Sequence, residues 1–417
     1  MTITGSAVSD FSTDTDSPVV IIGAGHAGAN LAALVRQEGF TGDVILLGDE
    51  VHDPYHRPPL SKKFMGDSLE QPLRGQGFYD EMKIDTRFGS RAARILPSER
   101  AVETADGSRI EYGTLVIATG SRPRRLNLPG ADAEGVMTLR TLDDARTLRS
   151  AVQRGGRLVI IGGGYIGLEV AAEARVHDLA VSVLEREERV LARVASHEFS
   201  TLLTDHHRVR GTDILTGVDV VGLATDGGAV IGVELADGTS IPCDAVLVGV
   251  GAIPNDELAA DCGINCADGI VVDENGRTSV PHVFAVGDAT RRPVGGDTMR
   301  FESIPSAMEQ AKRVAACIAG TPLPGAEVPW FWSDQFDLKL KIAGLVHHGV
   351  SVCRRGDAGA AKFGIFHLDD HNRLVAVETA NAPSFFMAGK KFIASSAVLD
   401  PQRIADPDTD LRSCLAG

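Results

Sequence analysis

Apolar and polar positions follow the same order twice along the chain. In each copy a short apolar run precedes a glycine-rich turn and a segment with helical spacing. A second strand, a hairpin turn and a third apolar strand follow. The first copy lies at residues 19–32, 43–49, 106–107 and 115–120, and the second at residues 157–174, 181–185, 237–238 and 245–251. Because strands that alternate with helices build parallel sheets, the pattern predicts two α/β units.

The segments outside the two copies predict how the domains are organised. A further apolar strand at 282–289 and a helical pattern at 306–320 follow the second copy. From about residue 326 the pattern becomes mixed, with both tryptophans and strand-like runs at 363–368 and 373–379. We predict an α/β fold with two Rossmann-like dinucleotide-binding domains and a C-terminal α+β domain. The expected boundaries are 1–17 for a disordered leader, 18–130 and 255–325 for the first nucleotide domain, 131–254 for the second, and 326–417 for the C-terminal domain.

Composition and charge exclude several classes of protein. A chain of 417 residues that is 43% hydrophobic and 23% charged is typical of a soluble globular protein with more than one domain. The net charge of −15 argues against nucleic acid as a partner, since phosphate binding needs a cationic face. No apolar run approaches the roughly 20 residues that cross a bilayer. The polar leader lacks the apolar core of a secretion signal, so we expect a cytoplasmic protein without a membrane partner.

The glycines of the first copy have the spacing of a dinucleotide-binding turn. Gly23, Gly25 and Gly28 follow a buried-type strand and open a helix. The first glycine permits a tight turn, the second lets a pyrophosphate approach the backbone, and the third lets the helix pack on the strand. The helix N-terminus then offers free N–H groups to the phosphates. Asp49 ends the next strand, where a carboxylate can accept hydrogen bonds from ribose hydroxyls.

The second copy repeats this arrangement with Gly162, Gly164 and Gly167, and Glu185 ends its next strand. A carboxylate at that place favours NADH, because a 2′-phosphate within about 4 Å would be repelled by roughly 4 kcal/mol at a surface-like dielectric. Arg186 follows directly and would weaken this preference if its side chain turned inward. Two dinucleotide sites in one chain imply hydride transfer from a nicotinamide to a resident flavin.

Several strings of residues resemble one family. In chain order they are VVIIGAGHAG, PYHRPPLSKKF, LVIATGSRP, LRTLDDA, VIIGGGYIGLEVAA, GVGAIPN, FAVGDA and PWFWSDQ. Together they resemble the glutathione-reductase-like, putidaredoxin-reductase-type ferredoxin reductases that serve bacterial haem monooxygenases and aromatic-ring dioxygenases. The resemblance runs from Pro18 to about Ile393, and RPPLSK and PWFWSDQ are its most specific strings.

The resemblance implies which residues contact each cofactor. The chain would bind FAD as its resident cofactor and NADH as its substrate. The residues implied for FAD are Gly23, Gly25, His26, Ala27, Gly28, Asp49, Arg57, Lys62, Ala92, Thr119, Gly120, Arg140, Asp288, Ile304 and Trp332. Those implied for NADH are Gly162, Gly164, Tyr165, Ile166, Gly167, Glu169, Glu185, Arg193 and Gly251.

Three of these residues carry the implied catalytic roles. Lys62 would pair with Glu169, and Trp332 would lie beside the flavin and nicotinamide rings, with Trp330 nearby. An ammonium beside the flavin favours the reduced, anionic ring, and a carboxylate holds that ammonium in place. Without the resemblance, Lys62 and Glu169 would be interpreted as surface groups that never meet.

The distribution of cysteines narrows the electron acceptor. The six cysteines are at 243, 262, 266, 317, 353 and 414, so the first nucleotide segment has none. Disulfide reductases of this architecture need a thiol pair beside the flavin, and that chemistry is therefore excluded. Cys262 and Cys266 are the only close pair, and no metal-ligand pattern surrounds them, so we predict no metal. The remaining route passes electrons singly to a carrier.

The resemblance implies that this carrier is a two-iron two-sulfur ferredoxin. Ferredoxins are usually acidic, so a basic docking face is expected. The candidates are Lys312, Arg313, Lys339, Lys341, Lys390 and Lys391. One departure concerns the C-terminal domain, where the family pattern Asn-Arg-Pro is Asn381-Ala382-Pro383 here. We expect a monomer or a weak dimer.

Three other functions stay open at this point. The same enzyme could serve rubredoxin, or the chain could be a non-catalytic redox-sensing flavoprotein. A membrane-surface quinone reductase would need a basic amphipathic C-terminal segment, whereas this chain ends in an acidic stretch broken by prolines. The predicted activity is that of a ferredoxin–NAD(+) reductase.

Overall fold

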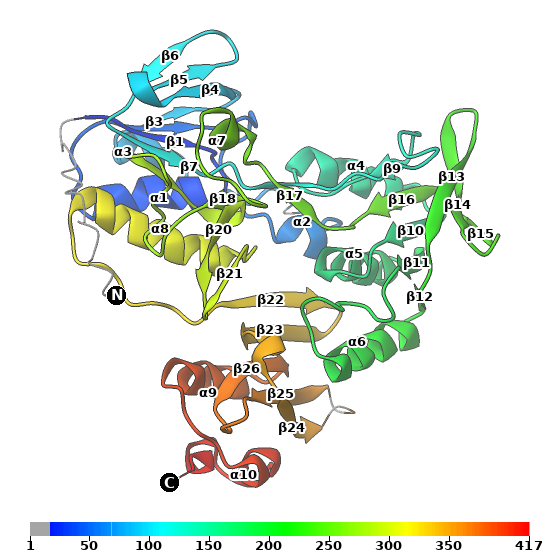
Figure 1. Ribbon diagram of the computed structural model, residues 1–417. Helices are drawn as coiled ribbons and strands as arrows, with labels where there is room; N and C mark the ends of the chain where they lie inside the picture. Colours follow the sequence, from blue (N-terminus) through cyan, green and yellow to red (C-terminus); the bar gives the residue numbers. More distant parts are fainter. Residues whose placement is uncertain (1–16, 68, 358, 360, 417) are drawn as a thin grey trace, which may run out of the picture. The chain divides into compact units, whose positions relative to one another are not determined.

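The computed structural model describes residues 17–67, 69–357, 359 and 361–416 (Figure 1). The chain divides into two compact units. The first unit holds the described residues up to Tyr55, Pro72–Ser121 and Pro254–Ala326. The second unit holds His56–Gln71, Arg122–Ile253 and the residues from Glu327 onward. The predicted disordered leader lies outside the described residues, except for Ser17.

The first unit is built on a parallel sheet with the strand order β19-β7-β1-β2-β3. Its strands are β1 (Val19–Ile22), β2 (Val44–Leu47), β3 (Ile84–Arg87), β7 (Thr114–Ile117) and β19 (Val283–Ala285). The central strand β1 is buried along its whole length, as expected for a strand covered on both faces. Helices α1 (His26–Gln37) and α8 (Ile304–Ala319) pack against each other over this sheet (Figure 1).

Smaller elements complete the first unit. An antiparallel sheet contains β4 (Ala92–Leu96), β5 (Ala101–Thr104) and β6 (Arg109–Glu111). A mixed sheet contains β18 (Ile270–Val271), β20 (Thr290–Val294) and β21 (Asp297–Met299), in which β18 pairs with β20 in parallel and β20 pairs with β21 antiparallel. The helical segments are α3 (Phe78–Glu81), η1 (Pro97–Glu99), α7 (Glu257–Asp261) and η2 (Gly287–Ala289). The turn of the β5–β6 hairpin contains the predicted Asp106–Gly107 pair.

The second unit contains a parallel sheet of the same kind, with the order β12-β11-β10-β16-β9. Its strands are β9 (Val136–Met137), β10 (Arg157–Ile161), β11 (Ala180–Glu185), β12 (Thr212–Thr216) and β16 (Ala245–Val248). The helices that accompany it are α2 (Pro59–Lys62), α4 (Leu142–Gln153), α5 (Tyr165–Val176) and α6 (His197–Val209). An antiparallel sheet of β13 (Val220–Asp226), β14 (Ala229–Leu235) and β15 (Ser240–Pro242) follows α6 and β12 in the chain.

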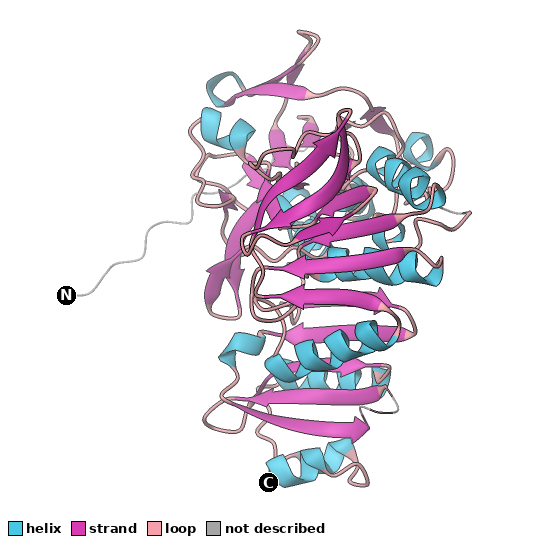
Figure 2. Cartoon of the chain, turned by 90° about the vertical axis from the view of Figure 1, so that its right-hand side faces the viewer, coloured by secondary structure: helices cyan, strands magenta, loops and turns pink. Residues whose placement is uncertain are grey.

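An antiparallel sheet with the order β22-β23-β26-β25-β24 forms the C-terminal part of the second unit (Figures 1 and 2). Its strands are β22 (Trp330–Gln335), β23 (Leu338–Gly344), β24 (Ser351–Asp357), β25 (Lys362–Leu368) and β26 (Leu374–Ala380). Helix α9 (Pro383–Ala394) covers β23, β25 and β26, and the remaining segments are η3 (Val346–His348), α10 (Pro401–Ala405) and η4 (Leu411–Cys414). The strands β8 (Ser121–Pro123) and β17 (Ala252–Pro254) pair with each other where the chain changes units.

The predicted fold class is confirmed, because each motif copy forms a parallel sheet and the C-terminal segment forms an antiparallel sheet with helices. The predicted domain boundaries stay a prediction. Within the described part of the chain, no helix is both long and apolar enough to cross a membrane.

Candidate nucleotide sites and a buried lysine–glutamate pair

The glycine turn after β1 has the shape that a bound dinucleotide requires. Gly23 has a φ of +111°, and a Cβ atom there would lie 2.2 Å from the carbonyl oxygen of Ala118. A Cβ atom at Gly28 would lie 1.9 Å from the carbonyl oxygen of Gly23. Gly25 caps α1 without a side-chain hydrogen bond, so the first N–H groups of the helix are left for another acceptor. This turn fits the pyrophosphate of FAD.

The first unit brings several predicted FAD residues to this turn. His26 and Ala27 form the buried first turn of α1. Asp288 lies in η2, and a Cβ atom at the preceding Gly287 would lie 2.9 Å from the Cβ atom of Ala27. Thr119 donates its hydroxyl hydrogen to the carbonyl of Asn255 over 2.6 Å. The other predicted residues of this unit are the exposed Asp49 after β2, the buried Ala92 in β4, Gly120 after β7, and Ile304 at the start of α8.

The second glycine turn has the same geometry, and its middle glycine faces open space. Gly162 has a φ of +113°, and a Cβ atom at Gly167 would lie 2.3 Å from the carbonyl oxygen of Gly162. At Gly164, by contrast, an added Cβ atom would meet nothing within 4 Å. Gly164 caps α5 without a side-chain hydrogen bond. The space at this position suits a second pyrophosphate, which is the arrangement expected for NADH.

Glu185 ends β11 beside this turn. One of its carboxylate oxygens accepts a hydrogen bond from the Gly163 N–H over 2.7 Å, and the other accepts from the Glu187 N–H over 2.9 Å. Arg186 does not turn inward, because its side chain is 77% exposed and its guanidinium pairs with Glu187 at 3.3 Å. The exposed Arg193 lies near Gly251, since its Nη2 would be 3.8 Å from a Cβ atom placed there.

Replacing Glu185 with alanine is expected to weaken the discrimination against NADPH. Even a quarter of the repulsion between this carboxylate and a 2′-phosphate is about 1 kcal/mol, so the NADH-to-NADPH ratio of kcat/KM should fall about fivefold. Steady-state rates with both nucleotides measure that ratio. Glu188→Ala, which removes a nearby charge of the same sign and leaves the Arg186–Glu187 pair intact, is the matched control and should leave the ratio unchanged. An equal ratio in the Glu185→Ala and parent proteins would contradict this role.

The structure brings Lys62 and Glu169 together inside the second unit. The Lys62 Nζ lies 2.6 Å from the Glu169 Oε1, and the Glu169 residue is only 3% exposed. The pair meets because α2, which ends at Lys62, packs on α5. Tyr165, at the start of α5, lies against Phe331 with ring centroids 4.6 Å apart. Burial raises the pKa of Tyr165 well above its ordinary value, and the carboxylates of Glu378 and Glu169 raise it further.

Two serines of this cluster were missed by the sequence analysis. The Ser61 hydroxyl donates to the Glu169 Oε2 over 2.5 Å, and the Ser333 hydroxyl donates to Oε1 over 2.5 Å. Ser61 lies in RPPLSK and Ser333 in PWFWSDQ, which are the two most specific strings of the family resemblance. A signal was therefore present, because a buried carboxylate needs more than one donor and serine is the short donor in each string.

The remaining predicted residues of the second unit lie on the same elements. The Arg57 Nη1 donates to the carbonyl oxygen of Arg140 over 2.6 Å. Trp332 is half-buried in β22, and its ring lies 5.8 Å from that of Trp330. The half-exposed Ile166 follows Tyr165 at the start of α5. The residues predicted for FAD thus divide between the two units, and their assignment to the cofactor stays a prediction.

Two groups of side chains change the sequence-based picture. Arg313 is buried and donates hydrogen bonds to the carbonyl oxygens of Glu274 and Pro324, so its prediction as a docking residue is wrong. A helical pattern cannot show that a residue on the polar side anchors a neighbouring loop.

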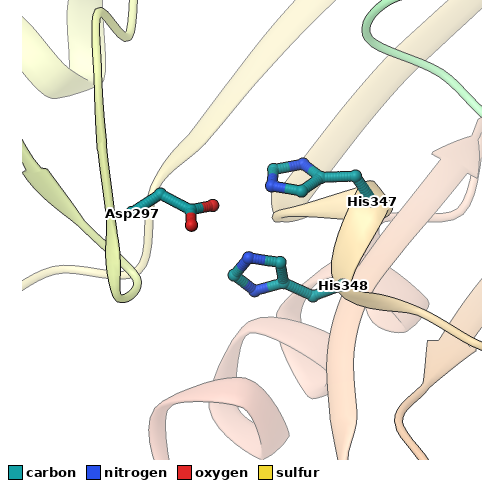
Figure 3. Close-up of side chains that lie close together, drawn as sticks. All are labelled: Asp297, His347 and His348. Atoms are coloured by element: carbon teal, nitrogen blue, oxygen red, sulfur yellow. The ribbon is translucent and has the colours of Figure 1, made fainter.

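The imidazole rings of His347 and His348 lie 4.4 Å apart (Figure 3). Asp297, drawn in the same picture, belongs to the other unit, and we assign no metal site to the group.

Two parallel-sheet nucleotide domains with glycine turns define the class of flavin- and pyridine-nucleotide-dependent oxidoreductases. Comparison with known families agrees, because residues 17–311 match the pyridine nucleotide-disulphide oxidoreductase family and residues 330–415 match the reductase C-terminal family. The chain belongs to the pyridine nucleotide-disulphide oxidoreductase family, whose cofactors are FAD and NAD(H). The recognition made from the sequence motifs is confirmed.

The similar proteins include several named reductases. The chain is 44% identical over 399 residues to the probable ferredoxin reductase CtmF of Castellaniella defragrans, a match that covers 94% of this chain and 97% of that protein. It is 40% identical to the ferredoxin reductase for the CYP199A2 system of Rhodopseudomonas palustris, with a TM-score of 0.92 and coverage of 96% and 100%. The reductase in a covalent putidaredoxin reductase–putidaredoxin complex is 36% identical, with a TM-score of 0.92 and coverage of 95% and 98%.

Proposed function

We propose that this protein is an FAD-dependent NADH:ferredoxin oxidoreductase. It takes a hydride from NADH and delivers electrons singly to a two-iron two-sulfur ferredoxin, which feeds a haem monooxygenase or an aromatic-ring dioxygenase. Relatives that match over almost their whole length carry the names of ferredoxin reductases, and one solved structure is of putidaredoxin reductase joined covalently to putidaredoxin. Both observations support the proposal for this chain.

One observation carries the proposal furthest. The cluster around Glu169 is an ion pair with two hydroxyl donors, and the first nucleotide segment has no cysteine. All six cysteines lie in the described part of the chain and are unpaired. A disulfide reductase would need a thiol pair beside the flavin. Electrons therefore leave singly, and the free thiols also support the proposed cytoplasmic location.

Different residues of the chain bind the two cofactors and hold the positive charge of Lys62 in place. FAD, when bound, supplies the group that accepts a hydride and releases its electrons one at a time. The first turns of α1 and α5 bind the two pyrophosphates through their N–H groups. Glu169 holds the ammonium of Lys62, so that a positive charge stays fixed in a place from which water is largely excluded. Trp332 would shield the reacting rings from water.

A basic face beside the tryptophans is the docking surface we propose for the ferredoxin. The Lys390 ammonium lies 5.2 Å from the centre of the Trp330 ring, and the Lys341 ammonium lies 5.4 Å from that of Phe386. Lys341 also pairs with Trp332 across β22 and β23. Lys339 is exposed on the same strand, where it contacts Asp334 at 3.2 Å. An acidic carrier would meet positive charge next to aromatic rings here.

The rate of ferredoxin reduction is expected to fall steeply as salt rises from about 50 to about 300 mM, because the screening length shortens across that range. The double variant Lys341→Gln, Lys390→Gln should flatten the salt profile and slow the reaction at low salt about tenfold. Steady-state ferredoxin reduction by NADH measures both effects. Lys83→Gln is the control, because this lysine belongs to the first unit and is distant in sequence from the proposed docking surface. A flat profile in the parent protein would refute the basic docking face.

An anaerobic acceptor panel tests the proposed function. The holoprotein is reduced with NADH or with NADPH and then offered a two-iron ferredoxin, rubredoxin or a quinone. We expect fast reduction of the ferredoxin with NADH. Preference for rubredoxin would change the partner within the same class. Failure with every acceptor, after complete reduction of the flavin, would replace the proposal with a redox-sensing role.

A further inference from the structure

The strand β22 presents its two faces to different surroundings. Because strand side chains alternate, Trp330, Trp332 and Asp334 share one face. Phe331, Ser333 and Gln335 share the other face. Phe331 contacts Tyr165, Ser333 contacts Glu169, and Gln335 contacts His207. The residues that face helices α5 and α6 include Ser333 and Gln335, which are fully buried.

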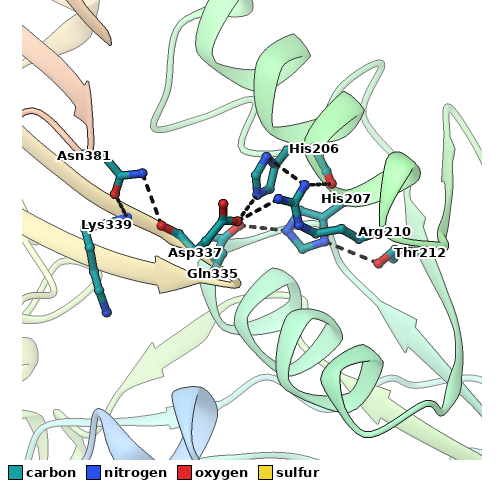
Figure 4. Close-up of polar contacts among 8 residues, drawn as sticks. All are labelled: His206, His207, Arg210, Thr212, Gln335, Asp337, Lys339 and Asn381. Atoms are coloured by element: carbon teal, nitrogen blue, oxygen red, sulfur yellow. Dashed lines mark hydrogen bonds and ion pairs between the residues drawn. The ribbon is translucent and has the colours of Figure 1, made fainter. Parts of the chain in front are cut away.

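A chain of hydrogen bonds runs along this buried face from α6 to Glu169. His207 is fully buried, and its Nε2 lies 2.9 Å from the Gln335 Oε1 (Figure 4). The Gln335 Nε2 lies 3.1 Å from the Ser333 Oγ, and that hydroxyl contacts the Glu169 Oε1 at 2.5 Å. At the far end the His207 Nδ1 lies 3.5 Å from the Thr212 Oγ1. Every member of the chain belongs to the second unit.

The donors and acceptors of these side chains fix the direction of each hydrogen bond between His207 and Glu169. The carboxylate of Glu169 can only accept hydrogen bonds, so Ser333 must donate its single hydroxyl hydrogen to it. Ser333 then accepts from its other neighbour, which fixes the NH2 group of Gln335 toward it. The Gln335 oxygen consequently faces His207 and requires a hydrogen on Nε2. His207 is left with an unprotonated Nδ1 that accepts from Thr212.

The environment of His207 supports that state of the ring. Burial lowers the pKa of His207 to about 4, so the imidazole is neutral at physiological pH. A neutral ring carries one hydrogen, and the chain assigns it to Nε2. Aligned hydrogen bonds of this kind polarise one another in a water-free interior. The neighbouring His206 contacts Asp337 at 2.9 Å and takes no part in the series of hydrogen bonds that leads to Glu169 (Figure 4).

We propose that Gln335 and His207 are positioning residues that act through Ser333 to hold Glu169, and thereby the Lys62 ammonium, in its working place. The inference rests on the proposed function in one respect, namely that Lys62 faces the flavin. Ser61 holds the other oxygen of the carboxylate. With both oxygens fixed by hydroxyl donors, Glu169 cannot follow Lys62 if the lysine side chain moves.

The first test determines which nitrogen of the His207 ring carries the hydrogen, and it uses the unaltered holoprotein. In a sample with 15N-labelled histidine at about pH 7, the signals of the His207 ring are assigned through its own backbone resonances, and they show which ring nitrogen carries the hydrogen. We expect its hydrogen on Nε2. A hydrogen on Nδ1 would break the chain at Gln335 and overturn the proposal. The result depends on neither a folded variant nor a ferredoxin.

The second test measures the flavin in variants of the chain. Gln335→Leu removes the donor to Ser333, and the rate of flavin reduction by NADH should fall about threefold. Ser333→Ala removes a donor to a charged group, and the rate should fall about tenfold. Ser333→Thr keeps the hydroxyl and should restore the rate to within about twofold. His206→Leu, on the adjacent position of α6, is the matched control.

The midpoint potential of the bound flavin separates positioning from a merely structural role. A threefold loss of preference for the reduced flavin corresponds to about 15 mV toward negative values, because tenfold is about 30 mV for a two-electron couple. We expect that shift in Gln335→Leu and none in His206→Leu. Parent-like potentials and rates in folded Gln335→Leu and Ser333→Ala would overturn the proposal. The rate of flavin reduction and the midpoint potential are both measured without ferredoxin. A protein that fails to reduce ferredoxin would therefore count against the proposed function and not against this inference.

Discussion

Replacing Glu169 with leucine is expected to slow the reduction of the bound flavin by NADH about a hundredfold. The substitution removes the carboxylate that lies 2.6 Å from the Lys62 ammonium, so the charge is no longer held in one place. It should also lower the free energy of unfolding by about 3 kcal/mol, because it leaves a buried charge without its partner. Anaerobic stopped-flow spectroscopy measures the rate, and thermal unfolding measures the stability.

The double variant Lys62→Met, Glu169→Leu separates these two effects. Without either charge, most of the lost stability should return, whereas the rate should stay low because no ammonium is present. Glu173→Leu, one turn further along α5, removes a carboxylate that contacts His177 at 3.7 Å and serves as the control. Recovery of the rate together with the stability in the double variant would show that the pair is structural only.

Introducing alanine at Gly164 is expected to weaken NADH binding at least tenfold without destabilising the protein. An added Cβ atom would meet nothing within 4 Å in the protein, and the residue has an extended φ of −79°. That empty space is where a pyrophosphate must approach the N–H groups of α5, and losing such a contact to a charged group costs about 1.5–3 kcal/mol. The dependence of flavin reduction on NADH concentration gives the affinity.

Gly167→Ala provides the contrasting result at the same turn. Its Cβ atom would lie 2.3 Å from the backbone oxygen of Gly162, so this variant should lose stability rather than only affinity. The flavin content of the Gly164→Ala protein should match that of the parent, since the first glycine turn is untouched. Parent-like NADH affinity in Gly164→Ala would mean that the dinucleotide binds elsewhere.

The two nucleotide domains were predictable because their signal is local. Each glycine turn lies between a buried strand and a helix, and β1 and β10 occupy the centre of their sheets as the motif requires. The grouping of His56–Gln71 with the second unit has no such signal. It depends on the packing of α2 on α5, a contact between segments more than a hundred positions apart in the sequence.

The candidate site was predictable where a glycine turn or the family resemblance pointed to a residue. Lys62 and Glu169 were found through the family resemblance, whereas Ser61 and Ser333 were passed over although they lie in its two most specific strings. Arg313 shows the opposite failure, because a cation in a helical pattern was interpreted as exposed, although it anchors a loop from inside. His207 carried no signal, since its partner Gln335 lies on a distant strand.

The most direct test of the account is the stoichiometry of a single turnover. The holoprotein is reduced anaerobically with one equivalent of NADH and mixed with an excess of oxidised two-iron two-sulfur ferredoxin. We expect that two ferredoxins are reduced for each NADH while the flavin returns to its oxidised state. A flavin that stays reduced, with no ferredoxin reduced, would contradict it.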